Sequence, residues 1–334
     1  MIRICFFLTI ISFSFGQNTK IELFNESIKY FKLNDHKNVI LNLNKFIELD
    51  STQSEIFYRR GYSKLMIKDY QSSVQDFNKA LLLLPKDPKS LFNKAFALHE
   101  IAKNDEAIEC LNQLIELEPN EFEAYSKRGE IYYDLKLYDK ALSDFLIVNK
   151  INSELDFAIN LLGLTYYKKN NFEGALNCFN KLIQINEFFP DAFNNRGLVY
   201  CSLRDFLKAI KDFDKAIEIK PIDDVYNNRA FCKFNLNDLN GALEDYSKAI
   251  ILNPNNESYF HDRGMNNYKL GRLNESLKDF DSAININAKL AVSYGIRAFV
   301  KYELKDFDGA CKDLKTAKEL GYDVSKLSSK VKCK

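Results

Sequence analysis

The sequence predicts an all-α solenoid of antiparallel helix pairs, because one pattern recurs about every 34 residues from Lys20 to Val324. Counted from Lys20, position 8 of every period is Gly, Ala or Ser, and position 20 is Ala, Ser or, once, Val39. Small side chains at two fixed positions allow the two helices of one period to pack closely. Proline, which cannot continue a helix, stands at position 32 of four periods: Pro85, Pro119, Pro221 and Pro254.

The period divides residues 17–324 into nine repeats, numbered 1 to 9: 20–53, 54–87, 88–121, 122–155, 156–189, 190–222, 223–256, 257–290 and 291–324. Each repeat predicts a helix A, a short polar turn near position 15 and a helix B. In repeat 6, helix A carries Phe193, Gly197 and Tyr200 at the i, i+4, i+7 spacing of one helix face. Helix B of this repeat carries Phe206 and Phe213 on one face in the same way.

Residues 1–16 predict a secretory signal peptide, with a positive Arg3 followed by an apolar run from Ile4 to Phe15. This run is too short to span a membrane, which takes about 20 apolar residues. We therefore expect cleavage after Gly16 and a mature chain without a membrane span. Such a chain is secreted across the inner membrane into the periplasm or out of the cell. An uncleaved membrane anchor is the alternative.

The other end of the chain, residues 325–334, predicts a short capping helix with a basic tail. Val324, Leu327 and Val331 are spaced as one helix face. A solenoid needs such a cover, because its last repeat has no following neighbour on which to bury its apolar face.

A 34-residue period with small residues at positions 8 and 20 resembles the tetratricopeptide repeat (TPR). The resemblance covers nearly the whole mature chain and implies a right-handed superhelix of helix pairs without strands. It also implies a role in protein–protein interaction, with the A helices lining an inner groove. The family implies no catalytic activity and no cofactor.

Composition excludes several other functions. The chain carries 47 basic and 46 acidic residues, and this balance gives no reason to expect a nucleic-acid partner. Its three histidines, His36, His99 and His261, fall in different repeats, so no metal site is expected. The sequence contains no nucleophile elbow, phosphate loop or dinucleotide fingerprint, and we predict that the protein is not an enzyme.

One charge pattern follows the repeat. Position 7 is Arg in six repeats, and position 23 is Asp in the same six: Arg60 and Asp76, Arg128 and Asp144, Arg196 and Asp212, Arg229 and Asp245, Arg263 and Asp279, Arg297 and Asp313. In an antiparallel hairpin that turns near position 15, these two positions stand at the same height. We expect each pair to bridge helices A and B of its own repeat; duplication that copied both residues without contact is the alternative. An exposed pair would contribute only about 0–1 kcal/mol.

The groove positions that the resemblance implies are rich in aromatic and asparagine residues. The candidates for binding a peptide are Tyr62, Phe96, Tyr133, Asn160, Tyr167, Asn194, Asn195, Asn227, Asn228 and Phe231. An asparagine can donate to a peptide carbonyl and accept from its N–H, so a row of them could hold an extended backbone. The alternative is that many of the apolar side chains pack between neighbouring A helices. Position 9 is never Asn, so the two-carboxylate clamp of chaperone-adaptor TPRs is not expected.

Six cysteines follow the leader. Cys311 and Cys333 lie at similar distances before and after the turn at Gly321, so two antiparallel helices joined there would bring them together. The sequence leaves two alternatives open: a disulfide between them, or a buried Cys311 and a free Cys333. We expect the others to pack as small apolar groups without a partner: Cys110, Cys178, Cys201 and Cys232.

These observations favour a non-catalytic scaffold of the cell envelope that binds an extended peptide or partner segment in its concave groove. The alternative is a structural subunit that uses its ends or its convex face in a larger envelope assembly. The partner is a protein or peptide in either case. The sequence does not indicate its identity or the oligomeric state of the chain.

Overall fold

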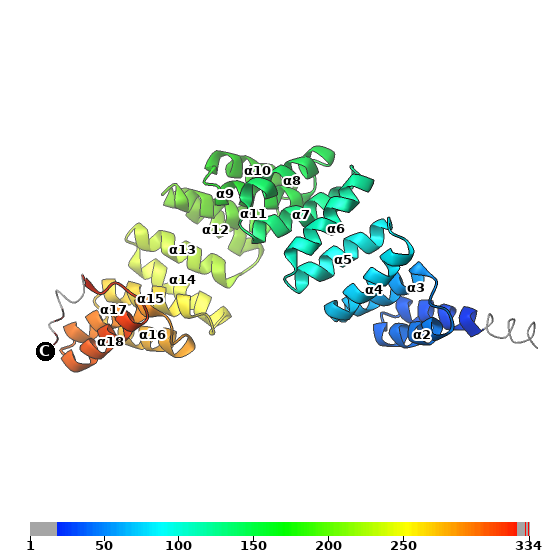
Figure 1. Ribbon diagram of the computed structural model, residues 1–334. Helices are drawn as coiled ribbons and strands as arrows, with labels where there is room; N and C mark the ends of the chain where they lie inside the picture. Colours follow the sequence, from blue (N-terminus) through cyan, green and yellow to red (C-terminus); the bar gives the residue numbers. More distant parts are fainter. Residues whose placement is uncertain (1–18, 326–330, 332, 334) are drawn as a thin grey trace, which may run out of the picture. The chain divides into compact units, whose positions relative to one another are not determined.

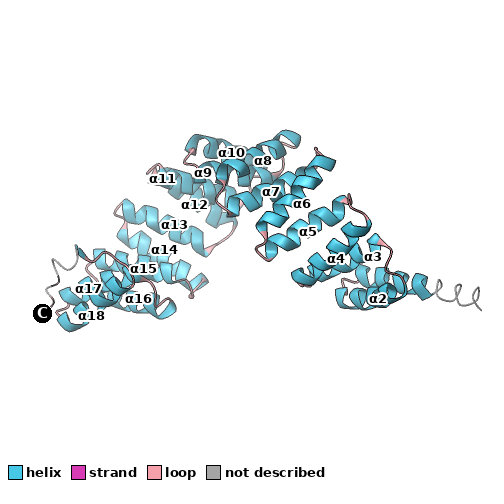
Figure 2. Ribbon diagram, in the orientation of Figure 1, coloured by secondary structure: helices cyan, strands magenta, loops and turns pink. Residues whose placement is uncertain are grey.

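The computed structural model describes residues 19–325 together with Val331 and Cys333. The predicted signal peptide, 1–16, lies outside the described residues, and so does most of the predicted capping segment. Among the described residues there are helices and connecting turns but no strand, which confirms the all-α class (Figure 2).

Along the chain, a helix A and a helix B alternate from repeat to repeat, as the sequence predicts (Figure 1). Residues 19–32 form helix A of repeat 1. The helices after it are α2 (His36–Leu49), α3 (Ser54–Met66), α4 (Tyr70–Leu83), α5 (Pro88–Glu100), α6 (Asn104–Leu117), α7 (Phe122–Asp134), α8 (Tyr138–Ile151), α9 (Asp156–Lys168), α10 (Phe172–Ile185), α11 (Pro190–Ser202), α12 (Phe206–Ile219), α13 (Asp223–Asn235), α14 (Leu239–Leu252), α15 (Glu257–Lys269), α16 (Leu273–Ile286), α17 (Ala291–Glu303) and α18 (Phe307–Glu319). Odd-numbered helices are the A helices of the repeats, and even-numbered helices are the B helices.

The chain forms two compact parts, residues 1–161 and 162–334, and the boundary between them falls within α9. In the first part, α2 to α8 pack each on the next, and α3 also contacts α5 while α5 contacts α7. In the second part, α10 to α18 do the same, and α11 contacts α13 while α13 contacts α15. Within each part, therefore, A helices of successive repeats lie side by side.

Every turn from helix A to helix B has the same geometry. The residue at position 15 has a positive φ in all nine repeats, and only Gly271 is a glycine there. The eight others are Asn34, Lys68, Ala102, Lys136, Asn170, Arg204, Asn237 and Lys305. In five repeats an aspartate then caps helix B, as Asp205 does by accepting from the backbone N–H of Lys208. This shared turn gives helix A and helix B the same axial alignment in every repeat.

The small residue at position 8 makes room for a large ring at position 24 of the same repeat. A Cβ added to Gly197 would lie 2.6 Å from the Phe213 ring, and one added to Gly163 would lie 2.7 Å from the Phe179 ring. The ring is fully buried in each case. Where position 8 is Ala or Ser, position 24 is usually a leucine, as in the pair Ala95 and Leu111. The two positions therefore complement each other in volume across the A–B contact.

The six arginines at position 7 bind the six aspartates at position 23, within their own repeats. Each guanidinium uses Nε and Nη2 as a fork on the two carboxylate oxygens, as Arg196 does on Asp212 at 2.8 and 2.6 Å. The shortest distances between nitrogen and oxygen in the six pairs are 2.6–2.7 Å. The predicted bridge between helices A and B is thus present in all six repeats, and its aspartate side chains are only 2–8% exposed, so the pairs are largely buried.

The same arginines also make two contacts that the sequence analysis missed. The third nitrogen, Nη1, donates to an oxygen at position 25 of the preceding repeat, as Arg196 does to Asn180 at 2.7 Å. The six acceptors are Asn44, Asn112, Asn180, Asp214, Ser247 and Asp281. Each guanidinium also lies 5.3–5.7 Å from the centre of an aromatic ring at position 4. One side chain thus joins both helices of its repeat to helix B of the repeat before it.

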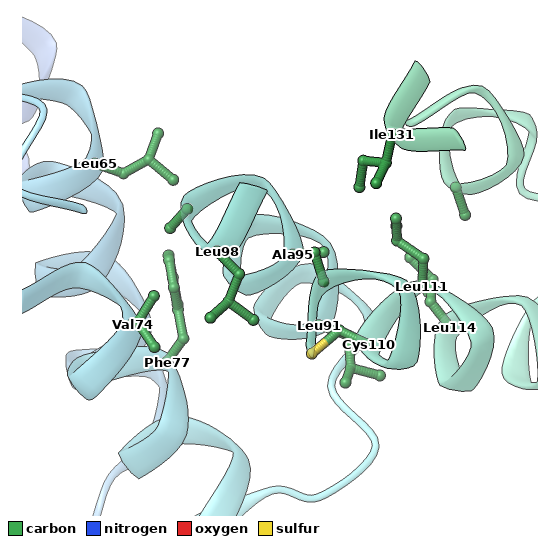
Figure 3. Packing of buried hydrophobic residues seen from close by; sticks show 13 residues of the cluster. Leu65, Val74, Phe77, Leu91, Ala95, Leu98, Cys110, Leu111, Leu114 and Ile131 are labelled. Atoms are coloured by element: carbon green, nitrogen blue, oxygen red, sulfur yellow. The ribbon is translucent and has the colours of Figure 1, made fainter. Parts of the chain in front are cut away.

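Repeat 3 has Lys94 at position 7 and uses apolar contacts instead. Its Cys110 takes the place of the aspartate at position 23, and its Leu91 takes the place of the aromatic ring at position 4. Both side chains belong to a core cluster that extends from Leu65 of α3 to Ile131 of α7. Figure 3 shows side chains from these successive helices pointing into this common core. Repeats can therefore be joined by hydrophobic burial where the arginine is missing.

At the C-terminal end, Cys311 of α18 forms a disulfide with Cys333, with Cα atoms 5.6 Å apart. Val331 is buried beside Ala298, Ala310 and Leu314 of the last repeat. Val331 thus covers part of the apolar face of repeat 9.

We predict that Gly197→Ala lowers the free energy of unfolding by about 1–2 kcal/mol, because the new methyl group overpacks the Phe213 ring. The loss occurs although alanine favours a helix by about 1 kcal/mol over glycine. Urea unfolding of a double-mutant cycle checks this: Phe213→Leu should remove most of the cost of Gly197→Ala. Gly264→Ala is the control with a smaller expected loss, since its Cβ would lie 3.2 Å from Phe280. Additive effects in the cycle would contradict the complementarity.

We predict that Asp212→Ala lowers the free energy of unfolding by about 3 kcal/mol or more, because it leaves the Arg196 guanidinium without its carboxylate in a largely buried place. Chemical unfolding measures the loss. The matched control on the same helix is Glu218→Ala, which removes an exposed pair with Lys215 and should cost less than about 1 kcal/mol. Equal losses in the two variants would show that the buried fork has no special role.

Candidate functional site

The A helices of the C-terminal part form an open hollow across three successive repeats. Its volume is roughly 360 Å³, and it is lined from α9, α11 and α13 by Tyr167, Leu198, Cys201, Ser202, Asn228 and Phe231. These residues occupy positions 6, 9, 12 and 13 of their repeats. The A helices pack side by side, and the contacts of Arg196 and Arg229 with helix B of the preceding repeat hold them in place. This packing brings the lining positions together.

The lining of this hollow combines an apolar surface with hydrogen-bonding groups. Phe231 is 47% exposed, although it meets the ring of Phe206 edge-on at 6.4 Å. The hydroxyl of Ser202 donates to the carbonyl of Leu198 at 3.1 Å and lies 3.0 Å from the hydroxyl of Tyr167. Since the serine proton is already used, the tyrosine hydroxyl donates to Ser202 Oγ. The oxygen of Tyr167 keeps its acceptor capacity at the edge of the hollow.

The predicted row of asparagines bonds largely within itself. Asn228 Nδ2 donates to Asn194 Oδ1 at 3.1 Å, and Asn194 Nδ2 lies 3.4 Å from Asn195 Oδ1. Asn227 turns to the next A helix, where its Nδ2 donates to Asp262 Oδ2 at 3.2 Å. Of these side chains, only Asn228 lines the hollow. The row thus links α11 to α13 to α15, and most of its amide groups serve the protein itself.

Asn160 shares position 5 with Asn194 and Asn227 and lies half-buried in α9. It does not line the hollow.

The N-terminal part contains a second, smaller hollow of about 240 Å³ that includes the predicted Tyr62. Tyr62 lies 5.9 Å from the ring of Phe31 and 6.3 Å from that of Tyr58. Three charged residues, Glu55, Arg59 and Lys89, also line this hollow. Its lining is therefore more polar than that of the first hollow.

Two other predicted groove residues pack against other helices: Phe96 contacts the neighbouring A helix, as the alternative held, and Tyr133 contacts helix B of its own repeat. The ammonium of Lys127 lies 4.8 Å from the centre of the Phe96 ring. This partly buried ring packs against the core cluster that extends from Leu65 to Ile131. Tyr133 meets Tyr138 edge-on at 5.5 Å. Neither of these two rings lines either hollow.

Buried ionisable groups lie next to the asparagine row. Burial raises the pKa of the Asp262 carboxyl above its usual value, and the hydrogen bond from Asn227 offsets only part of this rise. Burial also lowers the pKa of His261, whose Nδ1 lies 2.7 Å from the hydroxyl of Ser293. Across the described part of the chain, no group of His, Cys, Asp and Glu side chains is arranged to hold a metal ion.

The sequence analysis was wrong about two of the cysteines. Cys201 and Cys232 were expected to lack a partner, but their sulfur atoms are 2.6 Å apart, between α11 and α13. They stand at positions 12 and 10 of successive A helices, a relation that repeat numbering alone does not mark as a contact. Leu198, Cys201 and Ser202 line the hollow from positions 9, 12 and 13, which the resemblance places on the groove face, although they were not among the candidate binding residues.

Comparisons with known proteins agree with the helix-pair architecture. A family model described as TPR repeat matches residues 103–136 and 163–203, and one described as tetratricopeptide repeat matches 190–223 and 224–256. No curated protein matches the chain.

Several solved structures share the fold. A tetratricopeptide repeat protein from Parabacteroides merdae is 20% identical, with a TM-score of 0.61, over 75% of this chain and 99% of its own. The C-terminal part of a TPR repeat-containing protein from Cytophaga hutchinsonii is 15% identical, with a TM-score of 0.60, over 72% of this chain and 98% of its own. A chain of the APC/C hetero-tetramer Cut9–Hcn1 is 13% identical, with a TM-score of 0.58, over 83% of this chain and 55% of its own. At these identities the likeness shows the fold alone.

Proposed function

Because the chain is a tetratricopeptide repeat protein, we propose that it is a non-catalytic interaction scaffold that binds an extended peptide or partner segment along its A helices. The observation that carries this proposal is the hollow formed by Tyr167, Leu198 and Phe231 from three successive repeats. A side chain such as Phe231, 47% exposed on a surface that is concave, gains from covering by a partner.

The chemistry of the hollow suits a peptide more than a small polar molecule. Its apolar floor, formed by Leu198 and Phe231, would accept an apolar side chain of the partner. The Tyr167 oxygen and the amide of Asn228 stand beside that floor, where they can bond to a peptide backbone. Anchoring by a few side chains with polar groups around them is the common design of a peptide-binding surface.

We place this scaffold in the cell envelope. Two features support the placement: the leader-like residues 1–16 and the disulfide between Cys311 and Cys333. Disulfides persist in a periplasm or outside the cell and are rare in a reducing cytosol. Along the described residues, none of the helices has the length and apolar character needed to cross a membrane.

A second candidate function is a structural subunit that assembles through its B helices. Leu82 and Ile251 both occupy position 29 and are 71% and 79% exposed. Most other repeats have a charged or amide side chain at that position. Exposed aliphatic residues at one position of the outer helices favour a contact with another protein there.

We predict that Phe231→Ala weakens peptide binding about 3–10-fold, because full burial of a phenylalanine is worth about 1.5–3 kcal/mol and about half of this side chain is left for a peptide to cover. Peptides are selected from a random displayed library on the wild-type protein, and their affinities for each variant are measured by calorimetry. Phe231→Ala should keep the unfolding midpoint of the wild type within a few degrees, because the ring is half exposed.

The matched control for that experiment is Ile251→Ala, which removes an exposed aliphatic side chain from helix B of the same repeat. It should leave peptide affinity unchanged. Peptides that bind Phe231→Ala as tightly as the wild type would contradict the groove proposal. Loss of binding in Ile251→Ala alone would favour the structural subunit.

A further inference from the structure

Two thiols meet beside the hollow, and only one of them, that of Cys201, lines it. Cys201 of α11 and Cys232 of α13 belong to different repeats and are 31 residues apart, yet their sulfur atoms are separated by 2.6 Å. A sulfur–sulfur bond is about 2.05 Å long, so the two side chains stand about half an ångström from bonding distance. The close approach joins the A helices of repeats 6 and 7, where α11 and α13 are in direct contact.

The two sulfurs differ in their access to solvent. Cys201 is half-buried and lines the hollow, so that a reagent entering the hollow can reach it. Cys232 is fully buried behind it, at 0% exposure. One thiol can therefore meet an external reagent, and the other can meet only the first thiol.

We propose that Cys201 and Cys232 are a redox-active pair, a modification site at which a disulfide-bearing oxidant creates a second disulfide between α11 and α13. The pair differs in kind from Cys311 and Cys333, which form a bond already present at the end of the chain. The existence of the pair does not depend on what the groove binds.

The reaction is two successive thiol–disulfide exchanges. The Cys201 thiolate attacks one sulfur of the oxidant, the oxidant's S–S bond breaks, and its other half leaves as a thiolate. The Cys232 sulfur then attacks the Cys201 sulfur of the mixed disulfide, and the second half of the oxidant leaves as a thiolate. Two protein thiols are oxidised, one oxidant disulfide is reduced to two thiols, and the two protons pass to the departing thiolates.

The order of attack follows from the surroundings of the two groups. The hydrogen bond with the Cys201 thiol and burial both raise the pKa of Cys232, so that Cys232 keeps its proton until Cys201 has reacted. Cys178 offers a comparison in the same part of the chain: burial raises its pKa to about 11, and it has no cysteine against it among the residues described.

The bond would fix the position of Phe231 relative to Leu198. Phe231 directly precedes Cys232, Leu198 lies one helical turn before Cys201, and both line the hollow. Oxidation would then hold the two A helices at one spacing and restrict how the hollow adapts to a ligand. This consequence, unlike the bond itself, rests on the proposed peptide-binding function.

The test equilibrates the purified protein in glutathione buffers of increasing oxidised fraction, quenches it with acid, and alkylates it in denaturant before trypsin digestion. The expected product is a linked pair of the peptides 197–204 and 230–233, which each contain one of the two cysteines. The peptide containing Cys178 should stay alkylated in every buffer. The linked pair containing Cys311 and Cys333, a bond already present, shows that quenching and digestion preserve disulfides.

Full alkylation of both Cys201 and Cys232 while the Cys311–Cys333 link is intact would overturn the proposal. Single variants test the order of attack. Cys232→Ser should accumulate a glutathione adduct on Cys201, whereas Cys201→Ser should leave the buried Cys232 at least tenfold less modified. Equal adduct formation in the two variants would overturn the assignment of Cys201 as the attacking thiol. Peptide affinity, measured on oxidised and reduced protein, separates failure of the redox pair from failure of the groove proposal.

Discussion

The arginine at position 7 is the interaction on which the arrangement of most repeats depends. Its fork binds the aspartate at position 23 and so joins helices A and B, while Nη1 reaches back to position 25 of the preceding repeat. Lysine could not do this, because only a planar guanidinium presents donors in a fixed fork with a further donor beside it. Since the aspartates are buried, leaving either partner alone would carry a desolvation cost. The contact therefore fixes both the hairpin and the stacking of one hairpin on the next.

The groove follows from this arrangement. An A helix held at a fixed height against its own helix B and the preceding helix B must lie beside the A helix before it. Tyr167, Leu198 and Phe231, which come from three repeats, then meet at one hollow. The same packing sets the sulfur atoms of Cys201 and Cys232 against each other. The binding surface and the redox pair are thus two products of one regular stacking, which needs no long loop.

Much of the fold could be predicted from the sequence, and the limits have physical causes. The period, the small residues and the pairing of Arg196 with Asp212 were visible because each rests on residue types that recur at fixed positions. The partner at position 25 was missed because Asn180, Asp214 and Ser247 share only an oxygen atom. The aromatic at position 4 could have been found, since it is present wherever position 7 is Arg. The asparagine row could not, because an amide bonds equally well to a peptide or to its neighbour.

The central claim is that each arginine couples its repeat to the preceding one, and hydrogen exchange of Asn180→Ala tests it most directly. This variant removes the acceptor on α10 and leaves the Arg196 pair with Asp212 intact. The control is Asn177→Ala, which changes an exposed asparagine on the same helix. The account predicts faster exchange of backbone amides in α11 and α12 as well as in α10 for Asn180→Ala, and no change for the control. Faster exchange confined to α10 would contradict the coupling.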